Sequence, residues 1–373
     1  MKRALAALCV IAALVAAGSA KADAVSAAKT ESVPAQAAYL IEANSGRVLL
    51  SQNADARLPM ASTTKIMTAL LAVESERLKE TVTVPKEAAG TEGSSMYLKA
   101  GEKIPLIDLV YGLMLTSGND AAVAIACFLD GDTDAFAARM NARAETLGLK
   151  DTHFVTPNGL HDPNHYTTAH DLALLAAAAL DNPTFAMIVQ TKYRDTEGDV
   201  LHKLKNKNRL LWEYEGGIGV KTGYTKAAGK CLVFAAERGG MKPVGVVLNC
   251  PSMWNTAKSM LDAAFQNYRA RTFLTHDTFF SVPVQDGVKK TLCAAPKRSI
   301  LYPTEIDGDG TYTVDVALAP TLCAPVPAGQ TVGTATLYRN GIAVCTVTVA
   351  AIETVEKVGF LYYFRRTVSD FAG

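Results

Sequence analysis

The chain has 373 residues, of which 49% are hydrophobic, and its 37 lysines and arginines nearly balance its 36 aspartates and glutamates. This length and apolar content suffice for one full hydrophobic core and a smaller second one, so we expect two domains. The formal net charge of +1 gives no field that would recruit a polyanion by charge alone, which excludes nucleic acid as an expected partner.

The N-terminus has the pattern of an export signal. Lys2 and Arg3 precede an apolar run over residues 4–17, and a small-x-small cleavage site follows at residues 22–24. We therefore expect a signal peptide over residues 1–24 and an exported, extracytoplasmic protein. A permanent N-terminal anchor is the alternative, although the run is shorter than the about 20 apolar residues of a membrane span.

Residues 25–272 are expected to form the main domain. Apolar runs at residues 38–41 and 47–50 flank Asn44-Ser45-Gly46, which predicts a β-hairpin. Helical periodicity begins after Pro59, and β signals return late in the domain before a last helical stretch. Early and late strands around a helical middle predict an α/β (α+β) fold with one mixed sheet closed by both chain ends. The further expected helices are 106–129, 134–147, 168–180 and 256–268, and the further strands are 217–221, 230–236 and 244–249.

The C-terminal part has a different texture. From about Phe273 the sequence consists of short runs rich in Val, Thr and Tyr, separated by turn residues such as Asn340-Gly341. This predicts a small all-β domain over residues 273–352. Residues 353–373 mix aromatic and basic side chains, a composition that suits an amphipathic helix lying on a membrane surface. The alternative is a terminal helix that docks on the β-rich domain.

Six cysteines follow the signal segment, and an exported protein can pair them. Cys231 and Cys250 lie on two apolar runs joined by a turn-like segment, so a hairpin can bring them near each other. Free buried thiols that pack as small hydrophobic side chains are the alternative. No CxxC spacing indicates a metal site. The six are Cys127, Cys231, Cys250, Cys293, Cys323 and Cys345.

Ser62-Thr63-Thr64-Lys65 is a Ser-x-x-Lys motif just inside the helix predicted after Pro59. Side chains three residues apart share a helix face, so the Lys65 amine can reach the Ser62 hydroxyl. The start of a helix also favours negative charge on a serine oxygen or its adduct. Alone this motif is a weak signal, because Ser26-Ala27-Ala28-Lys29 has the same pattern near the N-terminus.

Two further motifs supply the context. Ser117-Gly118-Asn119 lies in a predicted loop, and Lys221-Thr222-Gly223 ends a predicted strand. The three motifs follow in the order Ser-x-x-Lys, Ser-x-Asn, Lys-Thr-Gly, which is typical of β-lactamases and penicillin-binding proteins. Each motif alone has an ordinary structural explanation, but their joint occurrence in this order predicts a serine acyl-transfer site.

The chemistry explains these residue types. A serine hydroxyl needs a base to take its proton during attack. Lys65 can do this only when neutral, and burial beside Lys221 lowers its pKa in that direction. We expect Ser117 to relay a proton to the leaving amine and Asn119 to hold the substrate amide. We expect Lys221 and Thr222 to receive the terminal carboxylate of the substrate, and Gly223 to let the substrate backbone approach the strand edge.

Over roughly residues 36–270 the chain resembles the serine-type D-alanyl-D-alanine carboxypeptidases, the low-molecular-mass penicillin-binding proteins. Four segments carry the resemblance: residues 58–68, 116–122, 158–162 and 221–225. The resemblance implies a β-lactamase/transpeptidase-like peptidase domain followed by a β-rich domain, and often an amphipathic anchor. It implies an oxyanion hole formed by the backbone N–H groups of Ser62 and Tyr224.

The same resemblance implies the reaction. Ser62 would be acylated by the penultimate D-Ala of a peptidoglycan stem pentapeptide, the terminal D-Ala would leave, and water would release the product; β-lactam antibiotics would acylate the same serine. No cofactor or metal is implied. The protein would act in the cell wall or on the outer face of the cytoplasmic membrane.

One departure from the family pattern stands out. Many members have an arginine that helps to hold the substrate carboxylate in the region of residues 253–258, where Met253 or Trp254 stands here. Carboxylate recognition would then depend on Lys221 and Thr222.

A transpeptidase or endopeptidase could use the same serine, because the surface around the site sets the choice of acceptor. Three further functions compete with the carboxypeptidase assignment. A class A β-lactamase shares the motifs, but it needs a Glu-x-x-Leu-Asn segment between the second and third motifs, and none occurs. A catalytically silent wall-binding protein on the same scaffold is a second alternative. A metal peptidase using His161, His165 and His170 is a third, and the lack of His-Glu-x-x-His favours loop histidines instead.

Overall fold

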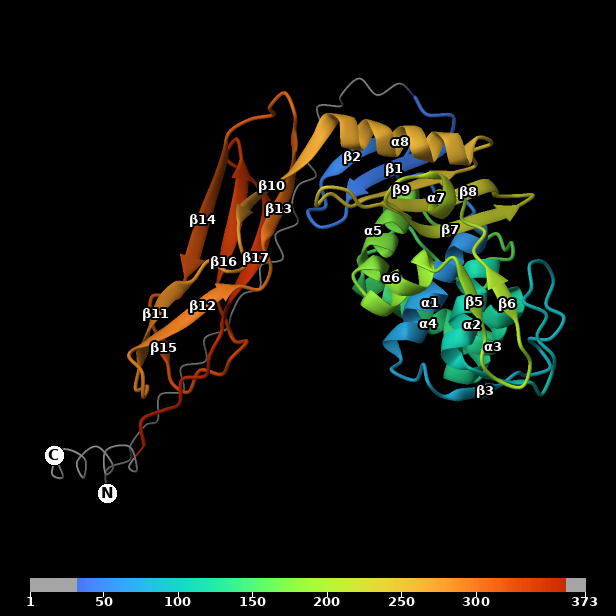
Figure 1. The fold of residues 1–373 in the computed structure, drawn as a ribbon, viewed down its shortest axis with the longest axis horizontal. Helices are drawn as coiled ribbons and strands as arrows, with labels where there is room; N and C mark the ends of the chain where they lie inside the picture. The colour runs from blue at the N-terminus through green and yellow to red at the C-terminus, as the bar shows by residue number, and fades with distance from the viewer. Residues whose placement is uncertain (1–31, 360–373) are drawn as a thin grey trace.

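The computed structural model describes residues 32–359. The predicted signal peptide and residues 360–373 of the C-terminal segment lie outside these residues. Figure 1 shows two parts joined end to end: a part in which helices pack on a sheet, and an elongated part made of strands.

A five-stranded sheet organises the first part, with the strand order β2-β1-β9-β8-β7. The predicted hairpin is confirmed as β1 and β2, and β1 also pairs with β9 from the far end of the domain. The sheet is closed by both chain ends, as expected, but it is not mixed: each of its strand pairs is antiparallel. Short turns join β7, β8 and β9, and such turns can connect only antiparallel neighbours. The strands are β1 (Ala37–Glu42), β2 (Val48–Gln52), β7 (Gly217–Thr225), β8 (Gly229–Ala236) and β9 (Pro243–Leu248).

The sheet is covered on both faces. Along β1, Tyr39 and Ile41 pack into the larger core with the helices of the domain middle, whereas Ala38 and Leu40 pack into a second core under α8 (Figure 1). This alternation follows from the period of two residues along a strand, and burial of both faces explains why β1, β8 and β9 are apolar almost throughout. The last helix is α8 (Met253–Asn267).

The helices largely follow the sequence prediction, with one break. The segment predicted as one helix over 106–129 forms α2, a π-helical turn η2 and α3, with a loop at Ser117-Gly118 between the last two. Ser117 has a left-handed backbone, φ +65°, which no α-helix accommodates. The helical elements are η1 (Ala61–Thr64), α1 (Lys65–Glu74), α2 (Leu106–Tyr111), η2 (Gly112–Thr116), α3 (Asn119–Asp130), α4 (Thr133–Thr146), α5 (Ala169–Leu180), α6 (Pro183–Gln190) and α7 (Leu210–Glu213).

Two small hairpins edge the helical layer: β3 (Thr81–Thr83) with β4 (Lys103–Pro105), and β5 (Tyr193–Asp195) with β6 (Lys203–Lys205). Within residues 32–359 no single helix is long and apolar enough to cross a membrane; α5 and α6 reach that length only together, with a bend of 103° between them.

The second part is a β domain with its own core, which includes Val282, Leu337 and Val349. The predicted boundary at residues 272/273 falls inside β10, which begins at Tyr268 and pairs with β13. At the other end, Val355 is fully buried in this core and bridges Val326, so the segment expected to be helical from Val355 begins as extended chain. The strands are β10 (Tyr268–Leu274), β11 (Phe280–Gln285), β12 (Thr291–Pro296), β13 (Ile300–Glu305), β14 (Tyr312–Leu318), β15 (Leu322–Cys323), β16 (Thr331–Arg339) and β17 (Ile342–Ala351).

Arg47, in the turn between β1 and β2, links the two parts. Its guanidinium donates to Asp309 Oδ2 at 2.5 Å and to Glu305 Oε1 at 3.0 Å, and it lies over the rings of Tyr268 and Tyr302. The side chains of Arg47 and Asp309 are only 7% and 6% exposed. A charge pair this buried is costly to break, so the hairpin turn is a fixed contact point for the β domain.

Candidate active site

Ser62 lies in a tight turn immediately before α1. The Ser-x-x-Lys motif was predicted inside a helix that starts after Pro59, but the structure has the 3₁₀ turn η1 at Ala61–Thr64 and begins α1 at Lys65. The chain enters this turn from extended backbone at Leu58, which bridges Thr167. In a 3₁₀ turn, side chains three residues apart eclipse each other. Lys65 Nζ accordingly lies 3.0 Å from Ser62 Oγ.

The Lys65 amine is fully buried and has three polar neighbours. It lies 3.0 Å from Ser62 Oγ, 2.7 Å from Asn119 Oδ1 and 2.5 Å from the carbonyl oxygen of Asn158. Two of these neighbours can only accept hydrogen bonds, whereas a hydroxyl can also donate. An ammonium can donate to all three oxygens, and a neutral amine, which has two hydrogens and one lone pair, can donate to Asn119 and Asn158 and accept from the Ser62 hydroxyl. The arrangement therefore suits an amine that takes the serine proton.

The electrostatic surroundings favour that neutral form. Burial lowers the pKa of Lys65 well below its ordinary 10.5, and the positive charges of Lys221 and Lys207 lower it further, while Asp120 acts in the opposite direction. Desolvation and a neighbouring like charge both penalise an ammonium. The predicted effect of Lys221 on Lys65 is thus present in the structure, and Lys207 is a second cation that the sequence did not single out.

The Ser117-Gly118-Asn119 loop brings the second motif to this amine. Ser117 is 6% exposed and Asn119 is 5% exposed. The Asn119 side chain is fixed at both ends, because Oδ1 accepts from Lys65 and Nδ2 donates to the carbonyl oxygen of Glu92 at 2.5 Å. The left-handed backbone of Ser117 is unusual for a residue other than glycine, and such strained positions concentrate at functional sites.

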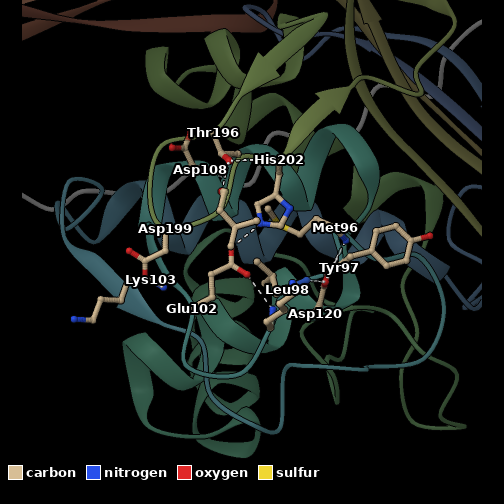
Figure 2. A network of polar contacts seen from close by, with 12 residues as sticks. Met96, Tyr97, Leu98, Glu102, Lys103, Asp108, Asp120, Thr196, Asp199 and His202 are labelled. Carbon is tan, nitrogen blue, oxygen red and sulfur yellow. Dashed lines mark hydrogen bonds and ion pairs between the residues drawn. The ribbon is translucent and has the colours of Figure 1, made fainter.

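Asp120 holds the neighbouring loop in place. Its carboxylate accepts hydrogen bonds from the Ser95 hydroxyl at 2.5 Å, from the Met96 N–H at 3.1 Å and from the Leu98 N–H at 3.0 Å. Figure 2 shows Asp120 directed toward Met96 and Leu98. Because Asp120 directly follows Asn119, the contacts that anchor residues 92–98 also fix the start of α3.

A second contact in Figure 2 ties this loop to the β5–β6 hairpin. Glu102 Oε1 lies 2.6 Å from His202 Nε2, and both side chains are at most 10% exposed. The loop over 92–102 is therefore held at both ends, by Asp120 at one and by His202 at the other.

Strand β7, at the edge of the sheet, carries the third motif. Lys221 is 2% exposed, and its Nζ donates to the carbonyl oxygen of Thr222 at 3.0 Å. Burial lowers the pKa of Lys221 to about 7, and the positive charge of Lys207 contributes to this shift. A Cβ atom at Gly223 would lie 3.1 Å from the backbone nitrogen of Ser62. The absence of a side chain at Gly223 therefore lets β7 pack closely against the Ser62 turn, in addition to the expected approach of the substrate backbone. Tyr224 is exposed.

Residues 158–162 have no role in the chemistry expected from the sequence. In the structure the Asn158 carbonyl accepts from Lys65, and Gly159 packs against the Ser62 turn with φ +84°. A Cβ atom at Gly159 would lie 2.0 Å from the carbonyl oxygen of Ala61. This Asn-Gly pair closes the site from a segment far from the other motifs. In the sequence, only the Asn-Gly dipeptide indicates this role, because a glycine after asparagine often takes a left-handed backbone.

His165 also supports the Ser62 turn. Its Nδ1 accepts from the Val155 N–H at 2.9 Å, so Nε2 carries the hydrogen and donates to Thr64 Oγ1 at 2.7 Å, and Thr64 donates in turn to the Ala61 carbonyl. Burial lowers the pKa of His165 to about 4. His170, which lies on α5, contacts Asp55, and His161 is exposed. Within residues 32–359 no group of three histidine, cysteine or acidic side chains is placed to hold a metal.

The cysteines of the described residues are all free thiols. Cys231 and Cys250 do not pair, because they pack on opposite faces of the sheet, one in each core of the first domain. Burial raises the pKa of Cys231 to about 11. Both therefore fit the alternative of buried thiols that act as small hydrophobic side chains.

The region without the expected arginine lies at the start of α8. Met253 and Trp254 are partly buried against the second core, and the Arg209 guanidinium lies 5.7 Å from the centre of the Trp254 ring. A cation from another segment is therefore present close to this position.

Comparisons with known proteins agree with this geometry. The family model described as D-alanyl-D-alanine carboxypeptidase matches residues 23–252, and the one described as Penicillin-binding protein 5, C-terminal domain, matches residues 268–357. A D-alanyl-D-alanine carboxypeptidase of Bacillus subtilis is 34% identical over 353 residues, which is 90% of this chain and 90% of that protein. One of Escherichia coli is 35% identical over 349 residues, covering 88% and 86%.

The likeness extends to solved structures. Penicillin binding protein 5 from Haemophilus influenzae superposes with a TM-score of 0.71 at 28% identity, covering 88% of this chain and 99% of that chain. The carboxypeptidase from Francisella tularensis superposes with a TM-score of 0.65 at 27% identity, covering 88% and 95%. The chain thus belongs to the D-alanyl-D-alanine carboxypeptidase family, the low-molecular-mass penicillin-binding proteins, with both the peptidase domain and the β-rich C-terminal domain.

Proposed function

We infer that the chain is a serine-type D-alanyl-D-alanine carboxypeptidase that removes the terminal D-Ala from peptidoglycan stem pentapeptides through an acyl-enzyme on Ser62. The observation that carries this assignment is the buried amine of Lys65, 3.0 Å from Ser62 Oγ, with two acceptors on its remaining sides. Membership of the family supplies the reaction class.

The proposed acylation begins with neutral Lys65. Its lone pair takes the proton of the Ser62 hydroxyl as Oγ attacks the carbonyl carbon of the penultimate D-Ala. The backbone N–H groups of Ser62 and Tyr224 are our candidates for the donors that stabilise the oxyanion. Gly223 supports this choice, because its lack of a side chain lets β7 approach the backbone nitrogen of Ser62.

Collapse of the tetrahedral adduct breaks the peptide bond, and the departing amine of D-Ala needs a proton. We assign its delivery to Lys65, now protonated, through the hydroxyl of Ser117. Asn119 is fixed at both ends of its side chain and is our candidate for holding the substrate amide. Water then attacks the acyl-enzyme, and the same groups act in reverse.

Strand β7 is the proposed binding edge for the substrate. Its outer side has no strand partner in the five-stranded sheet, so its backbone groups are free to pair with an extended peptide. Lys221 and Thr222 lie on this edge and are our candidates for the groups that receive the terminal carboxylate. β-Lactams, which carry a carboxylate beside their reactive carbonyl, would acylate Ser62 in the same orientation.

We further propose that residues 1–24 direct export and are removed, that the enzyme works outside the cytoplasmic membrane or in the wall, and that the C-terminal segment beyond the residues packed on the β domain contacts the membrane surface. The first domain, which ends with α8 at Asn267, would carry the enzyme activity, and the β domain that begins with β10 at Tyr268 would follow it. The basic and aromatic composition of the last segment supports the membrane contact.

The test is covalent labelling combined with peptide turnover. Penicillin-treated protein should gain one adduct on Ser62, and D-Ala should be released from a diacyl-D-Ala-D-Ala peptide. Ser62→Ala should lose both activities, whereas Ser281→Ala, an exposed serine on β11, should keep both. Rapid penicillin turnover without peptide cleavage would instead identify a β-lactamase, and the absence of any labelling would identify a non-catalytic scaffold.

A further inference from the structure

A cavity of about 550 Å³ lies beside the active site and has no role in the mechanism above. It is formed by the hairpin β5–β6, the segment that follows it and α7, which Figure 1 shows on the same side of the domain as β7. It reaches the active site through Thr116, the residue before Ser117. The lining residues are Thr116, Lys203, Lys205, Asn206, Lys207, Arg209, Trp212 and Glu213.

Lys203 and Lys205 lie on the same side of β6, and Lys207 and Arg209 follow them in the cavity lining. Lys203, Lys205, Lys207 and Arg209 are exposed, whereas Leu204, Asn206, Asn208 and Leu210 between them are buried. Residues two apart on an extended chain face the same way. The buried Asn206 holds the segment in place, because its Nδ2 donates to the carbonyl oxygens of Val189 and Thr191 at 3.1 and 3.0 Å.

Of these four cations, only Arg209 pairs with an acidic residue of the cavity lining. Glu213 is its only acidic lining residue, and it is already paired with Arg209 at 2.6 Å and with Lys258 at 2.7 Å. Across the hairpin, Asp195 is the strand partner of Lys203. In the part of the chain that the structure describes, neither Lys203 nor Lys205 forms an ion pair. At least two ammonium groups thus remain available to an anion.

The cavity also has an aromatic wall. Trp212 is 41% exposed and packs edge-on against Tyr193, which is 62% exposed, with 5.3 Å between ring centres. The ammonium of Lys205 lies 5.4 Å from the centre of the Trp212 ring. An exposed aromatic surface bordered by lysines suits a ligand that combines an apolar stem with a negative group.

Two contacts fix the distance from this cavity to the reaction centre. The N–H of Lys207 donates to the carbonyl oxygen of Leu115 at 3.1 Å, and its Nζ donates to that of Thr116 at 2.8 Å. The basic segment is therefore attached to the residues that directly precede Ser117. The cavity therefore borders the Ser117 loop of the active site.

We propose that the cavity is a subsite for a free carboxylate on the acyl donor, placed upstream of the two terminal D-Ala residues, with Lys203 and Lys205 as its cations and Trp212 packing against the aliphatic stem. This rests on the proposed function and extends it: Lys221 and Thr222 receive the terminal carboxylate, and the cavity selects stem peptides that carry a second one. A long flexible side chain with a terminal carboxylate fits the chemistry of this lining.

The test compares two peptides, one of which is extended by a terminal carboxylate. They are Nα,Nε-diacetyl-L-lysyl-D-Ala-D-Ala and the analogue with a succinyl group on Nε, which ends in a carboxylate. We expect the wild-type protein to cleave the succinyl peptide with a kcat/KM about tenfold higher at low ionic strength, a preference that rising salt reduces. In Lys203→Gln/Lys205→Gln the ratio of the two kcat/KM values should fall to near one. The matched control, Lys150→Gln on an exposed lysine elsewhere, should keep the wild-type ratio.

The outcomes distinguish a failure of the proposed subsite from a failure of the proposed carboxypeptidase activity. Equal cleavage of both peptides by the wild type, or an unchanged ratio in the double variant, overturns the subsite while leaving the carboxypeptidase intact. Cleavage of neither peptide overturns the carboxypeptidase and the subsite together. Should the double variant fail to fold by circular dichroism, Lys203→Glu alone decides: reversal of the charge should turn the preference for the succinyl peptide into discrimination against it, and an unchanged preference refutes the subsite.

Discussion

Gly159→Ala probes the contact on which the position of Ser62 depends. The added Cβ would lie 2.0 Å from the carbonyl oxygen of Ala61 and 2.8 Å from Thr64 Oγ1, whereas real Cβ contacts stay above 3.0 Å. The Ser62 turn and the segment around Gly159 must therefore move apart by about the difference, 3.0 − 2.0 = 1.0 Å. The Asn158 carbonyl, one residue away, binds the Lys65 amine, so the shift separates nucleophile and base.

The expected loss of stability in Gly159→Ala has two contributions. The left-handed backbone at φ +84° costs an alanine about 1 kcal/mol, and overpacking adds about 2 kcal/mol. We expect the free energy of unfolding to fall by about 3 kcal/mol and penicillin acylation to slow by about 100-fold, because displacements of this size have such effects on reacting groups.

Gly148→Ala is the matched control, since Gly148 has φ +73° and its added Cβ would meet nothing within 4 Å. Its free energy of unfolding should fall only by the backbone contribution, about 1 kcal/mol, and its acylation rate should not change. Denaturant unfolding measures stability, and stopped-flow labelling with a fluorescent penicillin measures acylation. If both variants lose equal stability and acylate at the wild-type rate, the packing argument for the Ser62 turn is refuted.

Four further predictions follow from the charges and contacts of the described residues. Lys207→Gln removes a positive charge that lowers the pKa of Lys65, so the acid limb of the acylation rate should move to higher pH; Asp120→Asn removes a charge that raises this pKa, so the limb should move to lower pH. Shifts in the same direction in both variants would contradict Lys65 as the base. Arg47→Ala leaves the Asp309 carboxylate without its closest cation and should cost about 3 kcal/mol by denaturant unfolding, against less than about 1 kcal/mol for the exposed Arg298→Ala. Alkylation of the native protein should modify the exposed Cys323 first and leave Cys231 and Cys250 unmodified until the chain unfolds; mass spectrometry that finds a disulfide in their place would contradict the free thiols.

The three motifs and most elements could be predicted because their signals are local. The hairpin around Asn44-Ser45-Gly46 and the later helices follow from turn residues and periodicity within single segments. The loop predicted around Ser117-Gly118 is present and breaks the helix predicted over 106–129, but the left-handed backbone of Ser117 is set by the surrounding fold. The 3₁₀ turn before Lys65 has the same origin, because contacts from Gly159 and His165 shape it.

What the sequence could not supply is proximity between distant segments. Asn158, Lys207 and Gly159 reach the site through packing, and nothing in their local sequence indicates that they lie beside Lys65. The antiparallel order of the sheet was missed for a similar reason: the pairing of β1 with β9 joins the two ends of the domain. The separation of Cys231 and Cys250 also follows from which sheet face each side chain occupies.

The pairing of β1 with β9 has a consequence for how the protein matures. Ala37 is aligned with Leu248 and Glu42 with Pro243. The interior strand β1 can therefore complete its pairing only after a strand some two hundred residues later has been synthesised. Until β9 emerges, β1 has apolar faces and backbone groups that no native neighbour covers, and contacts so distant along the chain form slowly. The central sheet of the first domain therefore cannot be completed until β9 has been synthesised, and β1 is open to non-native contacts until then.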